Sequence, residues 1–221
     1  RDPMSRDMPR RDFLIRAAVL GTAGGVVPAL LGAPDEPGGK PEKHGQGPQG
    51  ERKMAYAVPD LPYSFDALQP YIDEQTMRIH HGKHHQAYVT NGNNLLKDSP
   101  LASASVEDIC KVAFADKAAG LINNVGQHYN HIHFWKWMKP NGGGKKLPAK
   151  LAKAIDSDLG GYDKMRTDFV QAGMTQFGSG WCWIAVKDGK LAITKTPNGE
   201  NPLMHGAKPI LGCDVWEHSY Y

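Results

Sequence analysis

Several features that define common classes of protein are scarce or missing in this 221-residue chain. It holds three cysteines without C-x-x-C spacing, so neither a disulfide framework nor a zinc knuckle is indicated. No H-E-x-x-H motif of a zinc hydrolase and no internal repeat occurs. The 26 Lys and Arg residues barely outnumber the 23 Asp and Glu residues, and no basic stripe suited to nucleic acid is present.

Long apolar runs are also missing. Residues 17–33 form a weakly hydrophobic stretch, but glycines and a proline interrupt it, so no stable membrane anchor is expected. Arg10-Arg11 precedes this stretch, and the combination predicts a twin-arginine export signal over residues 1–33. The chain would then meet the twin-arginine translocase and end up periplasmic or secreted. The alternative is the amphipathic start of a cytosolic protein.

The rest of the chain divides by composition into three parts. Residues 34–55 are rich in Gly and Pro and predict a flexible linker. Residues 56–140 predict a helical domain, and residues 141–221 predict an α/β domain. Helices are expected at 73–96, from 105, and at 123–138, 147–159 and 163–177; strands are expected at 181–187, 190–195 and 209–213.

This order of elements predicts an α+β fold, with helices first and a small antiparallel sheet later. Asp188-Gly189 is a hairpin turn that would join the first two strands. A last helix is expected to start near Asp214 and would have only a few residues before the sequence stops. We therefore expect the sequence to be truncated within a helix.

Histidine is concentrated in two segments. Seven of the ten histidines fall there, and they are His80, His81, His84, His85, His128, His131 and His133. Asp214 and His218 are four residues apart, so on a helix their side chains would share one face and could bind one metal ion. One histidine from each segment would complete a site of three imidazoles and one carboxylate.

Such a site has more than one interpretation. A single histidine is most often a hydrogen-bonded core or surface residue, and most of these seven must be that. Zinc hydrolysis would need a general base beside an open zinc position, and the sequence shows none. Three imidazoles and a carboxylate favour a first-row redox metal instead.

Four motifs resemble the iron/manganese superoxide dismutase family. They are residues 77–88 (MRIHHGKHHQAY), 130–135 (NHIHFW), 177–183 (FGSGWCW) and 214–218 (DVWEH). The resemblance implies a helical N-terminal hairpin domain and an α/β C-terminal domain with a three-stranded antiparallel sheet. It implies His80, His131, Asp214 and His218 as ligands of one metal ion. The implied reaction is 2 O2•− + 2 H+ → O2 + H2O2, with the metal cycling between +3 and +2.

The choice of metal rests on one glutamine in this resemblance. Gln127 lies four residues before His131, where iron-type members carry the amide that holds the metal-bound solvent. The manganese-type position carries Gly199 instead. Iron is therefore favoured, and a manganese enzyme or one that works with either metal is the alternative.

The resemblance assigns further roles. Tyr88 and His84 match the pair that narrows the substrate channel and relays protons. The aromatic residues around the metal correspond to Trp181, Trp183 and Trp216. Glu217 and Tyr221 match residues that reach His218 and His84 of the partner subunit, which implies a homodimer, with a tetramer as the alternative. A non-catalytic periplasmic metal-binding protein would keep the ligands but not need His84, Tyr88 and Gln127.

Overall fold

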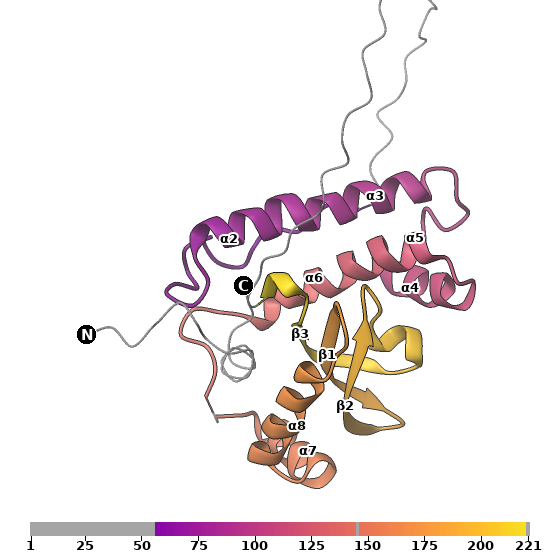
Figure 1. The fold of residues 1–221 in the computed structure, drawn as a ribbon. Helices are drawn as coiled ribbons and strands as arrows, with labels where there is room; N and C mark the ends of the chain where they lie inside the picture. The colour runs from indigo at the N-terminus through magenta and orange to yellow at the C-terminus, as the bar shows by residue number, and fades with distance from the viewer. Residues whose placement is uncertain (1–55, 145, 220–221) are drawn as a thin grey trace, which may run out of the picture.

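The computed structural model describes residues 56–144 and 146–219 (Figure 1). The predicted export signal (1–33) and the predicted linker (34–55) both lie outside this range, as does Tyr221 with its predicted contact to a partner subunit. Within the described residues, helices form one half of the molecule, and a sheet with two further helices forms the other. This is the α+β arrangement that the sequence predicts.

One continuous helix spans the top of Figure 1 and matches the helix predicted at 73–96. It consists of α2 (Glu74–Ile79), the π-helical turn η1 (His80–His85) and α3 (Gln86–Leu96). Asp73 caps its start, because the carboxylate accepts a hydrogen bond of 2.7 Å from the backbone N–H of Thr76. Nothing in the sequence indicated the π turn, a rare element that is frequent at functional sites.

The remaining N-terminal helices pack beneath it. Ser105 caps α4 (Val106–Ala115), which begins where the sequence placed a helix from 105. A further helix consists of α5 (Ala119–Leu121), a second π turn η2 (Ile122–Gly126) and α6 (Gln127–Trp137). It begins four residues before the predicted start. In Figure 1, α6 lies between the α2–α3 helix and the sheet, so its side chains can meet both.

The C-terminal half starts with α7 (Ala149–Leu159) and α8 (Tyr162–Met174). The three strands follow, with the short 3-10 turn η3 (Pro202–His205) before the last. They are β1 (Gly180–Lys187), β2 (Lys190–Pro197) and β3 (Lys208–Asp214), paired antiparallel in the order β2-β1-β3. The predicted three-stranded antiparallel sheet is confirmed.

Strand β1 serves two different cores because successive side chains of a strand point to opposite faces. Trp181 and Trp183 enter a cluster with the N-terminal helices. Cys182 and Ile184 enter a second cluster with α7 and α8. Asp214 is paired with Trp181 in the register of the sheet, so its carboxylate lies on the face toward the N-terminal helices.

The helix predicted to start near Asp214 is not formed. Strand β3 runs through Asp214, which still pairs with Trp181 of β1, and only the 3-10 turn η4 (Glu217–Ser219) follows in the described residues. The four-residue spacing to His218 predicted the contact between the two side chains, but for the wrong reason. A turn after the strand brings them together.

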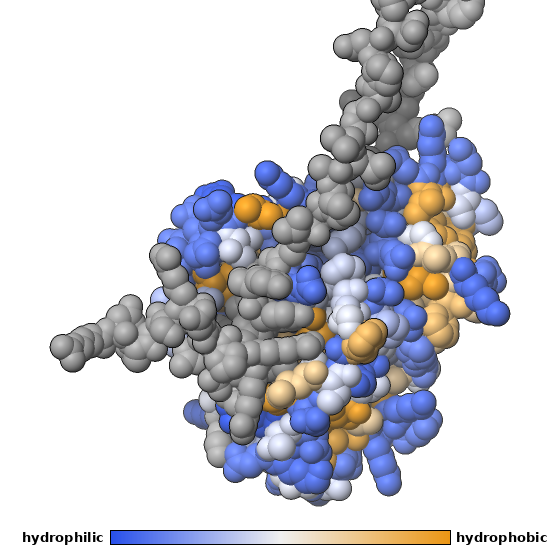
Figure 2. Space-filling model, viewed as in Figure 1, coloured by the Kyte–Doolittle hydropathy of each residue, from blue (hydrophilic) through white to orange (hydrophobic). Residues whose placement is uncertain are grey.

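The surface gives two further observations. No helix within the described ranges is long and apolar enough to cross a membrane. The visible face in Figure 2 is mostly hydrophilic, with apolar residues gathered at the end of α3 and over α4, where Leu95 and Val112 are exposed. Phe177, in the loop between α8 and β1, is 97% exposed.

Candidate metal centre

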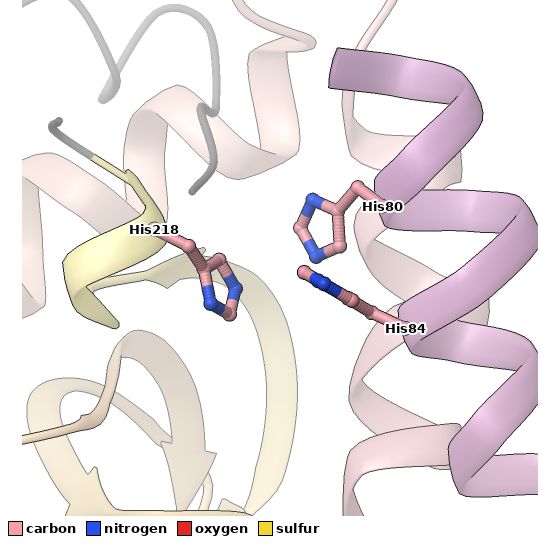
Figure 3. Close-up of side chains that lie close together, drawn as sticks. All are labelled: His80, His84 and His218. Carbon is pink, nitrogen blue, oxygen red and sulfur yellow. The ribbon is translucent and has the colours of Figure 1, made fainter. Parts of the chain in front are cut away.

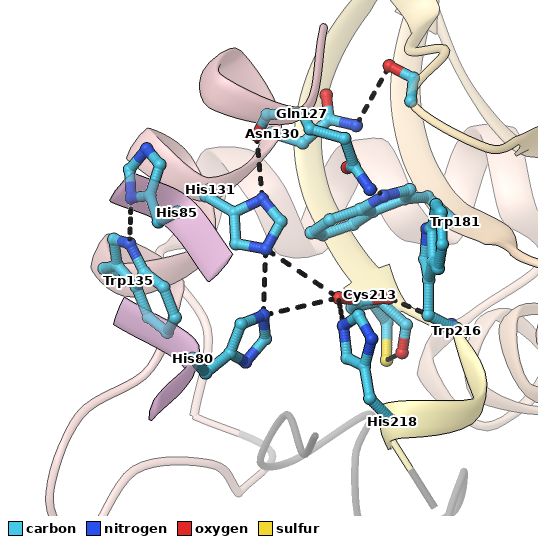
Figure 4. A network of polar contacts seen from close by, with 12 residues as sticks. His80, His85, Gln127, Asn130, His131, Trp135, Trp181, Cys213, Trp216 and His218 are labelled. Atoms are coloured by element: carbon cyan, nitrogen blue, oxygen red, sulfur yellow. Dashed lines mark hydrogen bonds and ion pairs between the residues drawn. The ribbon is translucent and has the colours of Figure 1, made fainter. Parts of the chain in front are cut away.

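Four predicted ligand residues meet between the helical half and the sheet (Figure 4). His80 comes from η1, His131 from α6, Asp214 from the end of β3 and His218 from η4. His80 and His131 approach with 2.9 Å between their Nε2 atoms, and His218 Nε2 lies 2.9 Å from Asp214 Oδ2. Asp214 Oδ2 is 3.8 Å from His80 Nε2 and 4.0 Å from His131 Nε2.

These distances fit a shared metal ion. Imidazole and carboxylate ligands sit about 2 Å from a first-row ion, so two atoms on the same ion are at most about 4 Å apart. All four distances fall within that limit. The four residues are also buried, with Asp214 and His131 at 0% exposure, so little solvent competes for their lone pairs.

Backbone contacts orient two of these side chains. His131 Nδ1 lies 2.7 Å from the carbonyl oxygen of Gln127, one turn earlier on the same helix. Since a carbonyl only accepts, Nδ1 carries the proton and Nε2 of neutral His131 presents its lone pair to the centre. Asp214 Oδ1 accepts a 2.9 Å hydrogen bond from the backbone N–H of Trp216, which leaves Oδ2 for the three histidines.

Burial prepares the imidazoles for ligation. It holds the pKa of His80 well below its usual range, and neighbouring histidines lower it further. Burial also lowers the pKa of His131 to about 4, although the charge of Asp214 acts in the opposite direction. For His218, burial alone would lower the pKa, but the charge and hydrogen bond of Asp214 together raise it. Neutral His80 and His131 at pH 7 are the form that binds metal.

The Gln127 side chain lies beside this group of donors. Its Oε1 accepts a 3.0 Å hydrogen bond from Trp181 Nε1. Its Nε2 is buried and has no hydrogen-bond partner among the described residues. A buried donor without a partner is costly, and in native proteins it points to a missing ligand, ion or water. The unsatisfied amide therefore fits a metal centre that carries a solvent molecule.

Aromatic residues enclose the donors on the sheet side. The Trp181 ring lies 5.3 Å from the His131 ring and stacks on Trp183 at 5.4 Å. Trp216 stacks on His218 at 5.7 Å. Trp181 and Trp183 are fully buried, so this side of the centre is dry. In a site of low polarity, each remaining charge acts more strongly than it would in water.

The two predicted channel residues lie on the other side. His84, in η1, is half-buried, with its ring 5.6 Å from His218. Tyr88 is half-buried one turn later, with its ring 5.4 Å from His131. Burial raises the pKa of Tyr88, and the charge of Asp214 raises it further, so its hydroxyl keeps its proton at neutral pH.

Comparison with known protein families identifies the family to which this chain belongs. The family model for the alpha-hairpin domain of iron/manganese superoxide dismutases matches residues 55–139, and the model for the C-terminal domain matches residues 147–221. The chain belongs to the iron/manganese superoxide dismutase family. Its activity is the dismutation of superoxide at one iron or manganese ion.

Named members of this family lie close in sequence. Superoxide dismutase [Mn] of Rhizobium meliloti is 63% identical over 168 residues, which cover 76% of this chain and 84% of that protein. Superoxide dismutase [Fe] of Synechocystis sp. is 48% identical, with the same two coverages, and that of Leptolyngbya boryana is 49% identical over 76% of this chain and 85% of its own. The names of these relatives include both metals.

A second polar network lies behind the donors, and the sequence assigned it no role. Trp135 Nε1 donates a 3.0 Å hydrogen bond to His85 Nδ1, and His85 Nε2 lies 2.8 Å from His128 Nδ1. Trp135 also packs edge-on against His80, with ring centres 5.0 Å apart. The only sequence signal for this role of Trp135 was its position four residues after His131, which places the two side chains on one face of the helix. The network supports the ligand helices from behind.

Proposed function

We propose that the chain dismutates superoxide with one iron ion, bound by His80, His131, Asp214 and His218. The convergence of these four donor groups within the reach of a single ion carries the proposal. When bound, the ion supplies one-electron chemistry, alternating between +3 and +2. The chain supplies a dry cavity, a fixed arrangement of donors and the control of protons.

Proton control falls to three side chains. Forming H2O2 from superoxide consumes two protons, and the donors themselves are enclosed by protein. Tyr88 holds a proton on its hydroxyl because burial raises its pKa. Gln127 Nε2 approaches that hydroxyl without completing a hydrogen bond, and its amide lowers the pKa of Tyr88 against the effect of burial. His84 stands at the half-buried edge, where solvent can renew the proton.

Iron is preferred over manganese because the amide beside the centre belongs to Gln127 on α6 and not to a side chain at position 199. Gln127 on α6 brings its side chain to the centre. At the alternative position, a Cβ on Gly199 would lie 2.8 Å from the Ile122 carbonyl oxygen and 3.1 Å from Asn123 Cα. The backbone there leaves no room for a side chain without a shift. The manganese name of the 63% identical relative makes manganese the alternative to test.

The test is to prepare the full chain metal-free, load it separately with iron and with manganese, and assay superoxide dismutation at equal occupancy. We expect high activity with iron and at least about tenfold less with manganese, the effect typical of a changed partner around a metal ligand. Equal activities, or higher activity with manganese, would overturn the iron assignment. Full occupancy without activity for either metal would favour a non-catalytic metal-binding protein.

We also propose a homodimer formed by the edge that carries η4. Ser179 and Trp216 both hydrogen-bond to Asn198, so the exposed Phe177 and Glu217, their chain neighbours, lie on one edge of the molecule. An apolar ring with 97% exposure on this edge is suited to burial against a second copy. Light scattering should give a dimer mass, and Phe177→Ser should weaken the association. A wild-type monomer at micromolar concentration would refute this.

For the N-terminus, we propose export by the twin-arginine translocase to the periplasm or beyond. The support is Arg10-Arg11 followed by the weakly apolar residues 17–33. Cell fractionation should find the full chain outside the cytoplasm. A chain in which both arginines are replaced by lysine should stay inside. Equal distribution of the two chains would contradict export by this route.

A further inference from the structure

The five donor side chains around the centre differ in their access to solvent. His80, His131, Asp214 and His218 are all buried, with exposures of 4% or less. His84 is half-buried and is the outermost of the five. An ion that arrives from solvent with its water shell must therefore lose water before it reaches the buried donors. A ligand on the way would lower that barrier, because waters could be replaced one at a time.

His84 is placed to be such a ligand. It projects from η1 one turn after His80, and both rings face His218 across the gap between this helix and η4 (Figure 3). The ring centres of His84 lie 5.8 Å from His80 and 5.6 Å from His218, and His80 and His218 are 4.9 Å apart. One ring nitrogen from each residue lies within 4.8 Å of the others, close enough to bind one ion after small rotations.

No other interaction accounts for the orientation of His84. Among the described residues, neither of its ring nitrogens has a hydrogen-bond partner, and its ring contacts are with His80 and His218. By contrast, His81 on the same turn lies 2.8 Å from the carbonyl oxygen of Pro59 through its Nε2. Within the described part of one chain, the nitrogens of His84 are therefore open to a metal ion, whereas His81 is engaged. The contact that the resemblance implies with Tyr221 of the partner subunit would use only one of the two nitrogens.

We propose that His80, His84 and His218 form an outer metal site that receives a divalent ion before it reaches the buried site. This inference rests on the proposed ligands of the buried site. His80 and His218 belong to both sites, so the ion moves inward by exchanging His84 for His131 and Asp214. The two sites cannot be filled together, because they share two ligands.

The ligand chemistry of the outer site differs from that of the buried one. Three imidazoles without a carboxylate favour Cu2+, Ni2+, Zn2+ and Co2+ over ions that prefer oxygen ligands. The outer site is therefore not selective for the active metal. Any of these ions in excess would occupy it and block loading, since it holds two of the ligands that the buried site needs.

The first test separates the two sites by mutation, with Co2+ alone as the probe. His131→Gln removes a ligand of the buried site and leaves the outer three histidines intact. We expect the metal-free H131Q chain to bind about one Co2+ with the strong visible absorption of a tetrahedral site. Adding His84→Gln should weaken binding by more than about tenfold, the loss that even an outer partner of a ligand causes. Adding His81→Gln instead should leave it unchanged.

Equal Co2+ affinity in H131Q and H131Q/H84Q would overturn the outer site. A second measurement avoids the risk that H131Q does not fold, because it leaves all buried ligands in place. In stopped-flow mixing, the H84Q chain should take up Co2+ several-fold more slowly than wild type, with the same final occupancy, and H81Q should match wild type. Unchanged uptake in H84Q would also refute the proposal.

Neither readout depends on turnover. An inactive iron-loaded enzyme would therefore count against the proposed function and leave the outer site standing. Conversely, an active iron enzyme whose Co2+ uptake ignores His84 would remove the outer site alone.

Discussion

Trp181 Nε1 donates a hydrogen bond of 3.0 Å to Gln127 Oε1. An indole N–H can only donate, so this contact decides which end of the amide is the oxygen. It leaves Gln127 Nε2 as a buried donor without a partner in the described part of the chain, near the Tyr88 hydroxyl. The strand thus fixes the orientation of an amide that a different element, α6, supplies.

Trp181→Phe should disturb catalysis through this amide. Without the indole N–H, the Gln127 side chain can rotate and present its oxygen to the centre. We expect activity per bound metal to fall about 10–100-fold, with a shift in the reduction potential of the metal. Activity and potential should be measured at matched metal content.

Trp183→Phe is the matched control. It removes a stacked indole from the same strand, but its Nε1 bonds Thr196 Oγ1 at 2.8 Å and does not reach Gln127. Its potential should stay close to that of wild type. Equal shifts of potential in the two variants would contradict a specific role for the Trp181 hydrogen bond.

His128 makes stability depend on pH. Burial lowers its pKa from 6.5 to about 4 in the folded chain. Between these values the unfolded chain binds a proton that the folded chain does not, so stability is lost as pH falls from about 6.5 to 4. The contribution of His128 to this loss is about 3 kcal/mol in total, at up to about 1.4 kcal/mol per pH unit.

His128→Gln tests this contribution. The amide oxygen can still accept from His85 Nε2, which lies 2.8 Å from His128 Nδ1 in the wild type. Urea unfolding of the metal-free chains at pH 7, 5.5 and 4.5 should show a shallower loss in the variant. Parallel pH profiles would mean that His128 is protonated equally in the folded and unfolded chains.

Two glycines should respond oppositely to alanine. A Cβ on Gly212 would lie 2.4 Å from Trp183 Cζ3 and 2.8 Å from Trp137 Cζ3, so both indoles would have to move. Gly212→Ala should cost about 1–3 kcal/mol of unfolding free energy. A Cβ on Gly82, in η1, meets nothing within 4 Å. Gly82→Ala should be neutral or stabilising by up to about 1 kcal/mol.

Chemical denaturation of both variants measures these effects. The comparison also tests how tightly β3 packs against the tryptophans next to the metal centre. If Gly212→Ala is as stable as wild type, the two indoles have more freedom than their packing indicates.

The three cysteines should be unreactive in the native chain. All three are buried and free. Burial raises the pKa of Cys110 to about 12, and a hydrogen bond with Cys182 and burial together hold the pKa of Cys213 well above its usual value. At pH 8 a thiol with a pKa of 12 has about 10³-fold less thiolate than a free cysteine.

A thiol reagent such as DTNB measures this directly. We expect no rapid reaction in the native chain and three thiols per chain after unfolding in guanidinium. One fast-reacting thiol under native conditions would show that a cysteine is accessible.

The sequence predicted the elements that local chemistry determines. Asp73 and Ser105 cap the helices that were expected to begin at 73 and 105, and Asp188-Gly189 turns between β1 and β2. The strand expected at 181–187 forms as β1, and its two faces follow from the two-residue period of a strand. The resemblance then supplied residues whose roles no local pattern defines.

Two features could not be predicted, for physical reasons. Asp214 was expected in a helix, because four-residue spacing to His218 suits one, but pairing with β1 extends β3 through it. Long-range strand pairing leaves no trace in local spacing. No site role for His85 followed from the sequence, yet it is fully buried, since His128 and Trp135 provide polar partners from a distant segment.

The π turn at His80–His85 joins α2 to α3 within the long N-terminal helix. It adds one residue to the repeat, so α3 is rotated relative to where an uninterrupted α-helix would carry it. Inserting one further residue into this turn would rotate everything after it by about 100°. Val89, Gly92 and Leu96 would then leave the core, although α2 and His80 stayed in place. The number of residues in this turn therefore decides which face of α3 packs into the core. The length of the segment matters to the fold as much as its histidines matter to the metal centre.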